Sequence, residues 1–341
     1  MPTHLLRLTL AFLFAIPGLL IASPAAACAC GAIASNDAAA QVNRETAIVS
    51  KTGNRETIDM RLSMRSVRSD AALIVPTPTP ATVSAGDGAL FDDYEKISAP
   101  RTETRRHWWS RSTDDDGATA GARAPASAAG AADPQVVARV RLGPLDITTL
   151  TGGDLDGLRK WLSDNGYQLK PAVISALAPY VAERWSFVAI ALTSPTALSG
   201  PLDPIRMEFD TDQLVYPMRM SAAATGTQTV DLYVLADHRQ DRTDADTARQ
   251  QVRTLYSGRL ADGRHLTTVR TTVTAPQSIS SDFVFATAAD DSPYRRVVYT
   301  DSDVTIAGMM AGPFLLVVGV IVLVVVVAGV AVAVGRRRID G

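Results

Sequence analysis

The C-terminal end of the chain carries an uninterrupted apolar run, Phe314–Val334, and three arginines follow it at 336–338. The run contains only Val, Leu, Ile, Ala, Gly and Phe. A helix that rises about 1.5 Å per residue spans roughly 31 Å over such a run, which is the thickness of a bilayer core. We therefore predict a transmembrane helix over residues 306–335. Basic residues favour the cytoplasmic side, so residues 336–341 are expected to form a cytoplasmic tail.

The N-terminal end has the pattern of a secretory signal. Arg7 precedes an apolar stretch from Leu8 to Ala22, and Pro24 and three alanines follow. A basic start, a short apolar region and small residues at the end are typical of a cleaved signal peptide, here residues 1–27. Together with the C-terminal helix, this pattern predicts a single-pass protein of the cell membrane with its folded part outside the cytoplasm.

The two cysteines of the chain, Cys28 and Cys30, lie directly after the expected cleavage site. A disulfide is permitted in an oxidising compartment, but a bridge across one residue is strained and stabilises little. Lipidation of Cys28 is a second interpretation, although Ala25 stands where a bulky aliphatic residue is expected. A metal site with a distant histidine is a third, and a structurally minor N-terminus is the interpretation that we favour.

The remaining chain is long enough for one large domain or two small ones. The net charge of the protein is −2, and the terminal segments hold more basic than acidic residues, so the middle is more acidic still. This balance argues against nucleic acid as a partner and against broad adhesion to anionic lipid. We expect an extracytoplasmic domain over residues 28–286 and a polar juxtamembrane stalk over residues 287–305.

Hydrophobic periodicity predicts an α+β fold, strand-rich with a central pair of helices. Asp154 can cap a first helix that ends at Asn165–Gly166, and Pro171 can begin a second that Pro179 must kink or restart. A short helix is also expected at Phe91–Ile97. Alternating apolar residues predict strands around residues 58–64, 136–142, 205–209, 216–220, 230–236 and 266–273, and Ala261-Asp262-Gly263 predicts a hairpin turn.

Residues 110–134 differ from the rest of the chain. They contain three consecutive aspartates and then mostly Gly, Ala, Ser, Thr and Pro, with almost no large apolar side chain. Such a segment cannot bury a core, so we expect a disordered insertion within the domain.

The sequence holds no established catalytic or cofactor-binding motif, and no cofactor is predicted from it. Three histidines of the expected mature chain, His107, His238 and His265, are far apart, and their spacing predicts no metal site. Asp237 and His238 follow a predicted strand, in a position where loops often carry function. The same two residues fit a solvated turn equally well.

The densest unusual cluster contains arginines, a histidine and tryptophans next to one another. These side chains could stack on a ligand ring or a sugar, or place the domain on lipid headgroups. The interpretation that we favour is that the tryptophans pack onto the core while the arginines stay in water. The candidate ligand-binding residues of this cluster are Arg105, Arg106, His107, Trp108 and Trp109.

Several longer stretches resemble a known family. CGAIAS near the expected mature start is followed in order by RETIDMRLSMRSVRSDAALIVPTPTPATVS, ALFDDYEKISAP, LRKWLSDNGYQLKPAVISALAPYVAERWSFVAIAL, PIRMEFDTDQLVYPMRMS and VDLYVLADHR. These stretches resemble the bacterial family known as domain of unknown function 2330. The resemblance implies a secreted, often membrane-anchored protein, and it implies no activity and no catalytic residue.

From these observations we expect a membrane-anchored module of the cell envelope that binds or scaffolds a protein or glycan partner. The bilayer is the other expected partner, through the C-terminal helix. The alternative is an envelope-associated hydrolase or metal-dependent enzyme, with its site near the tryptophan cluster or near Asp237 and His238.

Overall fold

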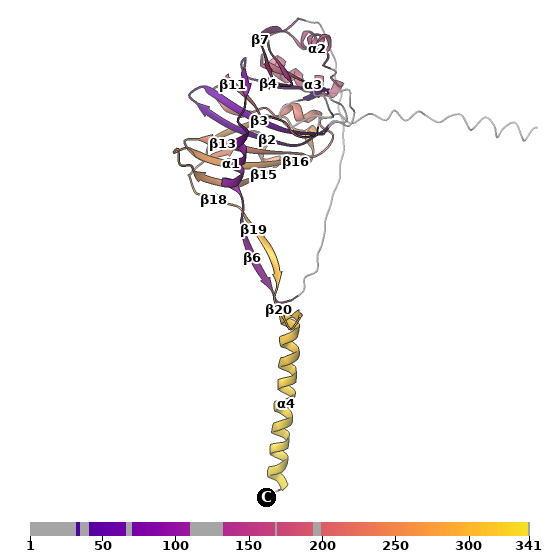
Figure 1. The fold of residues 1–341 in the computed structure, drawn as a ribbon, viewed down its shortest axis with the longest axis vertical. Helices are drawn as coiled ribbons and strands as arrows, with labels where there is room; N and C mark the ends of the chain where they lie inside the picture. The colour runs from indigo at the N-terminus through magenta and orange to yellow at the C-terminus, as the bar shows by residue number, and fades with distance from the viewer. Residues whose placement is uncertain are drawn as a thin grey trace, which may run out of the picture.

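The computed structural model describes residues 32–34, 41–65, 70–109, 132–167, 169–193 and 199–339. A strand-rich domain with a few helices stands above a narrow two-stranded ribbon, and a long helix continues from the ribbon (Figure 1). The α+β class expected from the sequence is confirmed. The expected signal peptide, Cys28, Cys30 and most of the expected insertion lie outside the described residues.

The largest sheet has nine strands in the order β18-β15-β16-β13-β2-β3-β11-β5, with β10 paired to β3. Its neighbours are antiparallel, except that β13 and β2 run parallel. The hairpin expected at Ala261-Asp262-Gly263 is confirmed: it joins β15 to β16, and Gly263 has the positive φ that such a turn requires. The strands are β2 (Gln41–Thr52), β3 (Arg55–Arg65), β5 (Thr82–Ala85), β10 (Ser199–Pro201), β11 (Ile205–Asp210), β13 (Gln228–Ala236), β15 (Gln251–Arg259), β16 (His265–Val273) and β18 (Tyr294–Arg295).

Two smaller sheets close the main core against one face of this sheet. Val234 of the large sheet, Val188 of the five-stranded sheet and Phe283 of the three-stranded sheet all belong to one buried cluster. Strand order is β1-β4-β9-β8-β7 in the five-stranded sheet and β12-β17-β14 in the three-stranded one. Their strands are β1 (Ala32–Ala34), β4 (Asp70–Thr77), β7 (Gln135–Leu142), β8 (Leu145–Thr151), β9 (Ser186–Thr193), β12 (Leu214–Tyr216), β14 (Gln240–Arg242) and β17 (Phe283–Thr287).

The helices cover the outer faces of the two larger sheets. α1 (Gly88–Ser98) places Tyr94 against Tyr233 of the large sheet, with ring centroids 6.0 Å apart, and buries Phe91 in the same cluster. α2 (Leu155–Asp164) and α3 (Pro171–Ala182) form the expected helical pair and pack onto the five-stranded sheet through a second cluster.

Local signals set the ends of the helical pair. The Asp154 carboxylate accepts a hydrogen bond from the Gly157 N–H at 2.9 Å, as expected for an N-cap. The second helix does not restart at Pro179, because α3 runs through this residue to Ala182. Pro179 costs the helix one hydrogen bond, because it has no N–H to donate to the carbonyl four residues earlier, and the Glu183 N–H still donates to the Pro179 carbonyl at 3.0 Å.

One expected strand is also wrong in part. Only Leu214–Tyr216 forms a strand, and the alternating stretch after it turns into a short 3-10 helix, η1 (Arg219–Ala223). The Asp282 carboxylate accepts the Met218 N–H at 2.7 Å and the Arg219 N–H at 3.0 Å. These bonds occupy backbone groups that a continuing strand would need for a neighbour.

Below the domain, β6 (Arg101–His107) and β19 (Val297–Asp303) form a parallel ribbon (Figure 1). Part of the stretch that we expected to be a polar stalk, Val297–Asp303, is therefore a strand that pairs with a segment almost two hundred residues earlier. A small hairpin follows, built from β20 (Thr305–Ile306) and β21 (Met309–Met310).

The last helix, α4 (Ala311–Ile339), begins five residues later than expected. Ala307 and Gly308 have positive φ angles of 52° and 80° and form the hairpin turn, which prevents an earlier helical start. Residues Ala311–Val334 are long and apolar enough to cross a membrane, with a mean hydropathy of 3.4. The chain thus has one candidate membrane span in its described part.

Candidate functional site

The loop after β13 is held by a residue that the sequence did not point to, Asp291. His238 Nδ1 lies 3.0 Å from Asp291 Oδ2, and the Arg239 N–H donates to Asp291 Oδ1 at 2.9 Å. Arg259 adds a third contact at 3.1 Å. The hydrogen bond from the Arg239 N–H, followed by that from His238, lowers the pKa of Asp291. Asp237 is exposed and contributes no side-chain contact to another described residue.

Behind Asp291 lie a histidine and a serine that are both 1 % exposed, His265 and Ser257. His265 Nε2 is 2.9 Å from Ser257 Oγ, and His265 Nδ1 is 3.9 Å from Asp291 Oδ1. Burial lowers the pKa of His265, and the nearby Asp291 offsets this only in part, so the ring is neutral at pH 7.

Ser257, His265 and Asp291 are arranged in the order of a hydrolytic triad. In such a triad the serine hydroxyl donates its hydrogen bond to the histidine, whereas here the donor and the acceptor are reversed. Ser257 Oγ donates to the Ser292 carbonyl at 3.1 Å, so it accepts from His265 Nε2–H. His265 Nδ1 is then left as a buried acceptor without a hydrogen-bond partner. A histidine in this tautomer cannot take the serine proton, and the buried hydroxyl cannot meet a substrate. The group therefore holds the loop in place.

An arginine-lined pocket with a volume of about 550 Å³ opens next to this loop. It forms at an open sheet edge, because β18 pairs only with Tyr256 and Ser257 of β15. The β15–β16 ladder is irregular between Thr254 and Tyr256, and at this point the Arg296 N–H holds the rim by donating to the Leu255 carbonyl at 2.9 Å. The lining residues are Arg239, Arg253, Thr254, Leu255, Tyr294, Arg296 and Val297.

The pocket has an excess of positive charge. Arg239 is shared between Asp241 at 3.3 Å and Asp290 at 4.0 Å, and its Nε is buried without a hydrogen-bond partner. Within the described ranges, no acidic side chain pairs with Arg253 or Arg296. Arg253 also lies opposite another arginine in the β15–β16 register. Three guanidinium groups around one hollow favour an anion.

The second set of predicted residues lies elsewhere, on the ribbon. The Arg105 guanidinium stacks on the Tyr299 ring with 3.4 Å to the ring centroid. His107 Nε2 contacts Asp301 Oδ1 at 2.5 Å, and Arg106 is exposed on the same strand. The structure thus separates Arg105, Arg106 and His107 from the loop of Asp237 and His238.

Trp108 and Trp109 are 47 % and 56 % exposed, so our favoured expectation that they pack onto the core is wrong. They follow β6 at the foot of the ribbon, and the Trp108 carbonyl accepts the Gly312 N–H of α4 at 2.8 Å. Their partner is the start of the apolar helix, which their position in the sequence did not indicate.

The described part of the chain has no group of three or more His, Cys, Asp or Glu side chains that could hold a metal ion. His238 and His265 share Asp291, whereas His107 is on the ribbon.

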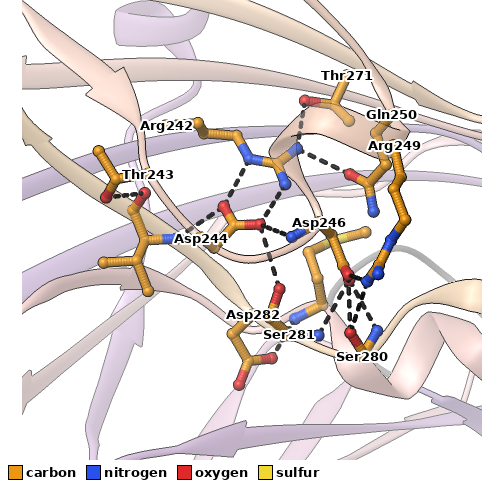
Figure 2. Close-up of polar contacts among 12 residues, drawn as sticks. Arg242, Thr243, Asp244, Asp246, Arg249, Gln250, Thr271, Ser280, Ser281 and Asp282 are labelled. Carbon is orange, nitrogen blue, oxygen red and sulfur yellow. Dashed lines mark hydrogen bonds and ion pairs between the residues drawn. The ribbon is translucent and has the colours of Figure 1, made fainter.

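A buried polar network of charged residues lies beyond β14 (Figure 2). Arg242 forms an ion pair with Asp244, and Asp246 binds Arg249 and the N–H groups of Ser280 and Ser281. Burial raises the pKa of Asp246, but these hydrogen bonds outweigh it and lower the pKa to about 2. The network joins residues 242–250 to residues 280–281, so we interpret it as a structural element.

The model of the family described as "Uncharacterized protein conserved in bacteria (DUF2330)" matches residues 24–286. The chain belongs to this family. The match ends before Asp291, Tyr294 and Arg296, so one rim of the pocket, β19 and α4 lie beyond the matched region.

Other comparisons add little about function. No curated protein matches the chain. Among solved structures, the crystal structure of baculovirus P35 aligns over 73 % of this chain and 97 % of its own, with 10 % sequence identity and a TM-score of 0.36. A similarity this low supports no argument about the fold or the role of this DUF2330 protein.

Proposed function

We propose that the protein is an extracytoplasmic binding module of the cell envelope, anchored by α4, which takes an anionic glycan in its arginine-lined pocket. The N-terminal signal pattern and the arginines after α4 support an outward-facing domain and a cytoplasmic C-terminus. The contacts around Asp291 support a preformed site, because hydrogen bonds hold both the loop and the neighbouring rim in place.

The observation that carries this proposal is the set of arginines around the pocket, Arg239, Arg253 and Arg296. A guanidinium presents parallel N–H donors that match the oxygens of a carboxylate or phosphate group. Tyr294 adds an exposed aromatic ring to the same rim, and such a ring can pack on the apolar face of a sugar. Arginines and an aromatic ring together favour a sugar with acidic groups.

The position of the pocket supports a ligand other than the bilayer itself. Val297 lines the pocket and is also the first residue of β19. Seven residues of strand at about 3.3 Å each place the pocket roughly 23 Å from the far end of the ribbon, where α4 approaches. A ribbon that stands on the membrane would hold the pocket beyond the reach of lipid phosphates.

The alternative, a hydrolase or metal-dependent enzyme, has weaker support. Ser257 and His265 have the spacing of a nucleophile and a base, but both are buried and their hydrogen bonds run in the opposite sense. We therefore retain the binding role as the proposal.

Titration calorimetry on the full chain in detergent micelles tests it. The ligand is an oligosaccharide of uronic acids, compared with the neutral oligosaccharide of the same linkage. We expect binding of the acidic sugar alone, and a loss of about tenfold or more in affinity for Arg253→Gln or Arg296→Gln, since a hydrogen bond to a charged group contributes about 1.5–3 kcal/mol.

Arg141→Gln is the matched control, because Arg141 is an exposed arginine of β7 outside the pocket. It should bind like the unchanged protein. Equal binding of oligoglutamate would replace the glycan by an acidic protein segment and contradict the proposal. Failure of every anion to bind, or equal losses in the control variant, would overturn it as well.

A further inference from the structure

We propose that Trp108 and Trp109, with Arg105 and Arg106 above them, form a collar that inserts into the lipid interface on the side of the folded domain. The partner is the bilayer that α4 crosses, and no ligand in the pocket is needed. The inference rests on the contacts at the foot of the ribbon, so it stands or falls separately from the proposed glycan site.

Trp108 and Trp109 lie level with the start of α4. The Trp108 carbonyl accepts the Gly312 N–H at 2.8 Å, and a Cβ added at Gly312 would lie 2.6 Å from the Trp109 ring. The candidate span begins at Ala311, the residue before. The Trp109 ring and the Trp108 backbone therefore lie beside the first turn of the apolar helix, where hydrocarbon gives way to headgroups if α4 crosses a bilayer.

Both tryptophan side chains are exposed. About half of the surface of each is open, although tryptophan is among the most apolar side chains. Its ring is apolar and its N–H is polar, so tryptophan concentrates at the boundary between lipid and water. Met309 of the adjoining hairpin is 53 % exposed and adds apolar surface at the same end.

Two arginines of β6 precede the tryptophans along the ribbon. Arg105 and Arg106 come directly before His107 and the tryptophans, on the side away from α4. Arg105 stacks on the Tyr299 ring, which holds its guanidinium beside the ribbon. Basic groups just above an aromatic belt meet the level of the lipid phosphates.

Backbone hydrogen bonds fix the collar to the helix. The Val304 N–H donates to the His107 carbonyl at 2.9 Å, and the Ala311 N–H donates to the Val304 carbonyl at 2.7 Å. The ribbon, the small hairpin and α4 thus form one hydrogen-bonded junction (Figure 1). Insertion of the rings would fix the distance of the domain from the membrane and limit its tilt relative to the bilayer. A single helix joined to the domain by a flexible tether would fix neither.

Fluorescence quenching by brominated lipid tests the collar on the full chain in phosphatidylcholine vesicles, with bromine near the headgroup end of the acyl chains. A Trp161→Phe/Trp185→Phe variant keeps the collar rings, and a Trp108→Phe/Trp109→Phe variant keeps the two rings near α2 and α3. We expect the first to lose most of its emission in brominated vesicles and the second to lose little. Both leaflets carry bromine, so either orientation of the protein gives the same readout.

Flotation of the vesicles in alkaline buffer establishes that each variant is inserted, and the Phe substitutions keep an aromatic ring at each site. Equal emission of the collar variant in brominated and plain vesicles would overturn the inference. Strong quenching of its emission by aqueous iodide in the vesicles would do so too, because it would place the rings in water.

Discussion

Arg242 and Asp244 face each other in a two-pronged ion pair, with Nε to Oδ2 at 2.8 Å and Nη2 to Oδ1 at 2.6 Å (Figure 2). Their side chains are 0 % and 2 % exposed. Gln250 and Thr271 accept from the remaining nitrogen of Arg242 at 2.8 and 3.2 Å. The guanidinium also lies over the Phe283 ring, 3.6 Å from its centroid, so a charge with no access to water is satisfied on every side.

Removal of one member of this pair should be strongly destabilising. Arg242→Met leaves the Asp244 carboxylate buried without its partner, so the free energy of unfolding should fall by about 3–5 kcal/mol. Urea unfolding of the full chain in micelles, followed by circular dichroism, measures the change. Arg264→Met removes the arginine of the exposed Arg264–Asp262 pair and should change stability by less than about 1 kcal/mol. Similar losses for both variants would contradict the argument.

The buried His265 should make stability depend on pH. Burial lowers its pKa in the folded protein below the ordinary value of 6.5. Between the two pKa values the unfolded chain binds a proton that the folded chain does not, so stability is full above pH 7 and declines as the pH falls below about 6.5. His265→Gln should flatten this decline in urea unfolding measured between pH 5 and pH 8.

A substitution next to His265 distinguishes the effect of His265 titration from a general loss of stability. Leu266→Ala removes a buried side chain from the adjacent position of β16 and should lower stability by about 2–5 kcal/mol at every pH. A decline with pH in His265→Gln as steep as in the unchanged protein would assign the effect to other groups.

The junction between ribbon and helix should tolerate no side chain at Gly312. A Cβ there would lie 2.4 Å from the Trp108 carbonyl oxygen and 2.6 Å from the Trp109 ring. Gly312→Ala should separate β6 from α4 and speed tryptic cleavage at Arg105 and Arg106 in the micellar protein.

Gly319→Ala is the matched control, since no atom lies within 4 Å of the added carbon in the same helix. It should leave the rate of cleavage unchanged. Slow cleavage of Gly312→Ala, equal to that of the control, would show that the junction yields without opening.

Elements that depend on neighbours in the chain were predictable. Asp154 caps α2, Gly263 turns the β15–β16 hairpin, and the apolar run at the end forms the predicted helix. The alternation through Met218 and Met220 gave a wrong strand, because both side chains are buried in a turn whose backbone binds Asp282. An alternating pattern of apolar residues indicates which side chains are buried. A buried turn can show the same pattern as a strand, so the pattern does not distinguish the two.

The sequence alone determined the candidate anchor, the α+β class and the two places where unusual side chains gather. These features follow from length, periodicity and capping, which act over a few residues. The tertiary structure alone decided that β6 pairs with β19, that Asp291 holds His238, and that Trp109 lies against α4. Each of these contacts joins segments separated by tens to hundreds of residues, and chain folding, rather than any local pattern, brings them together.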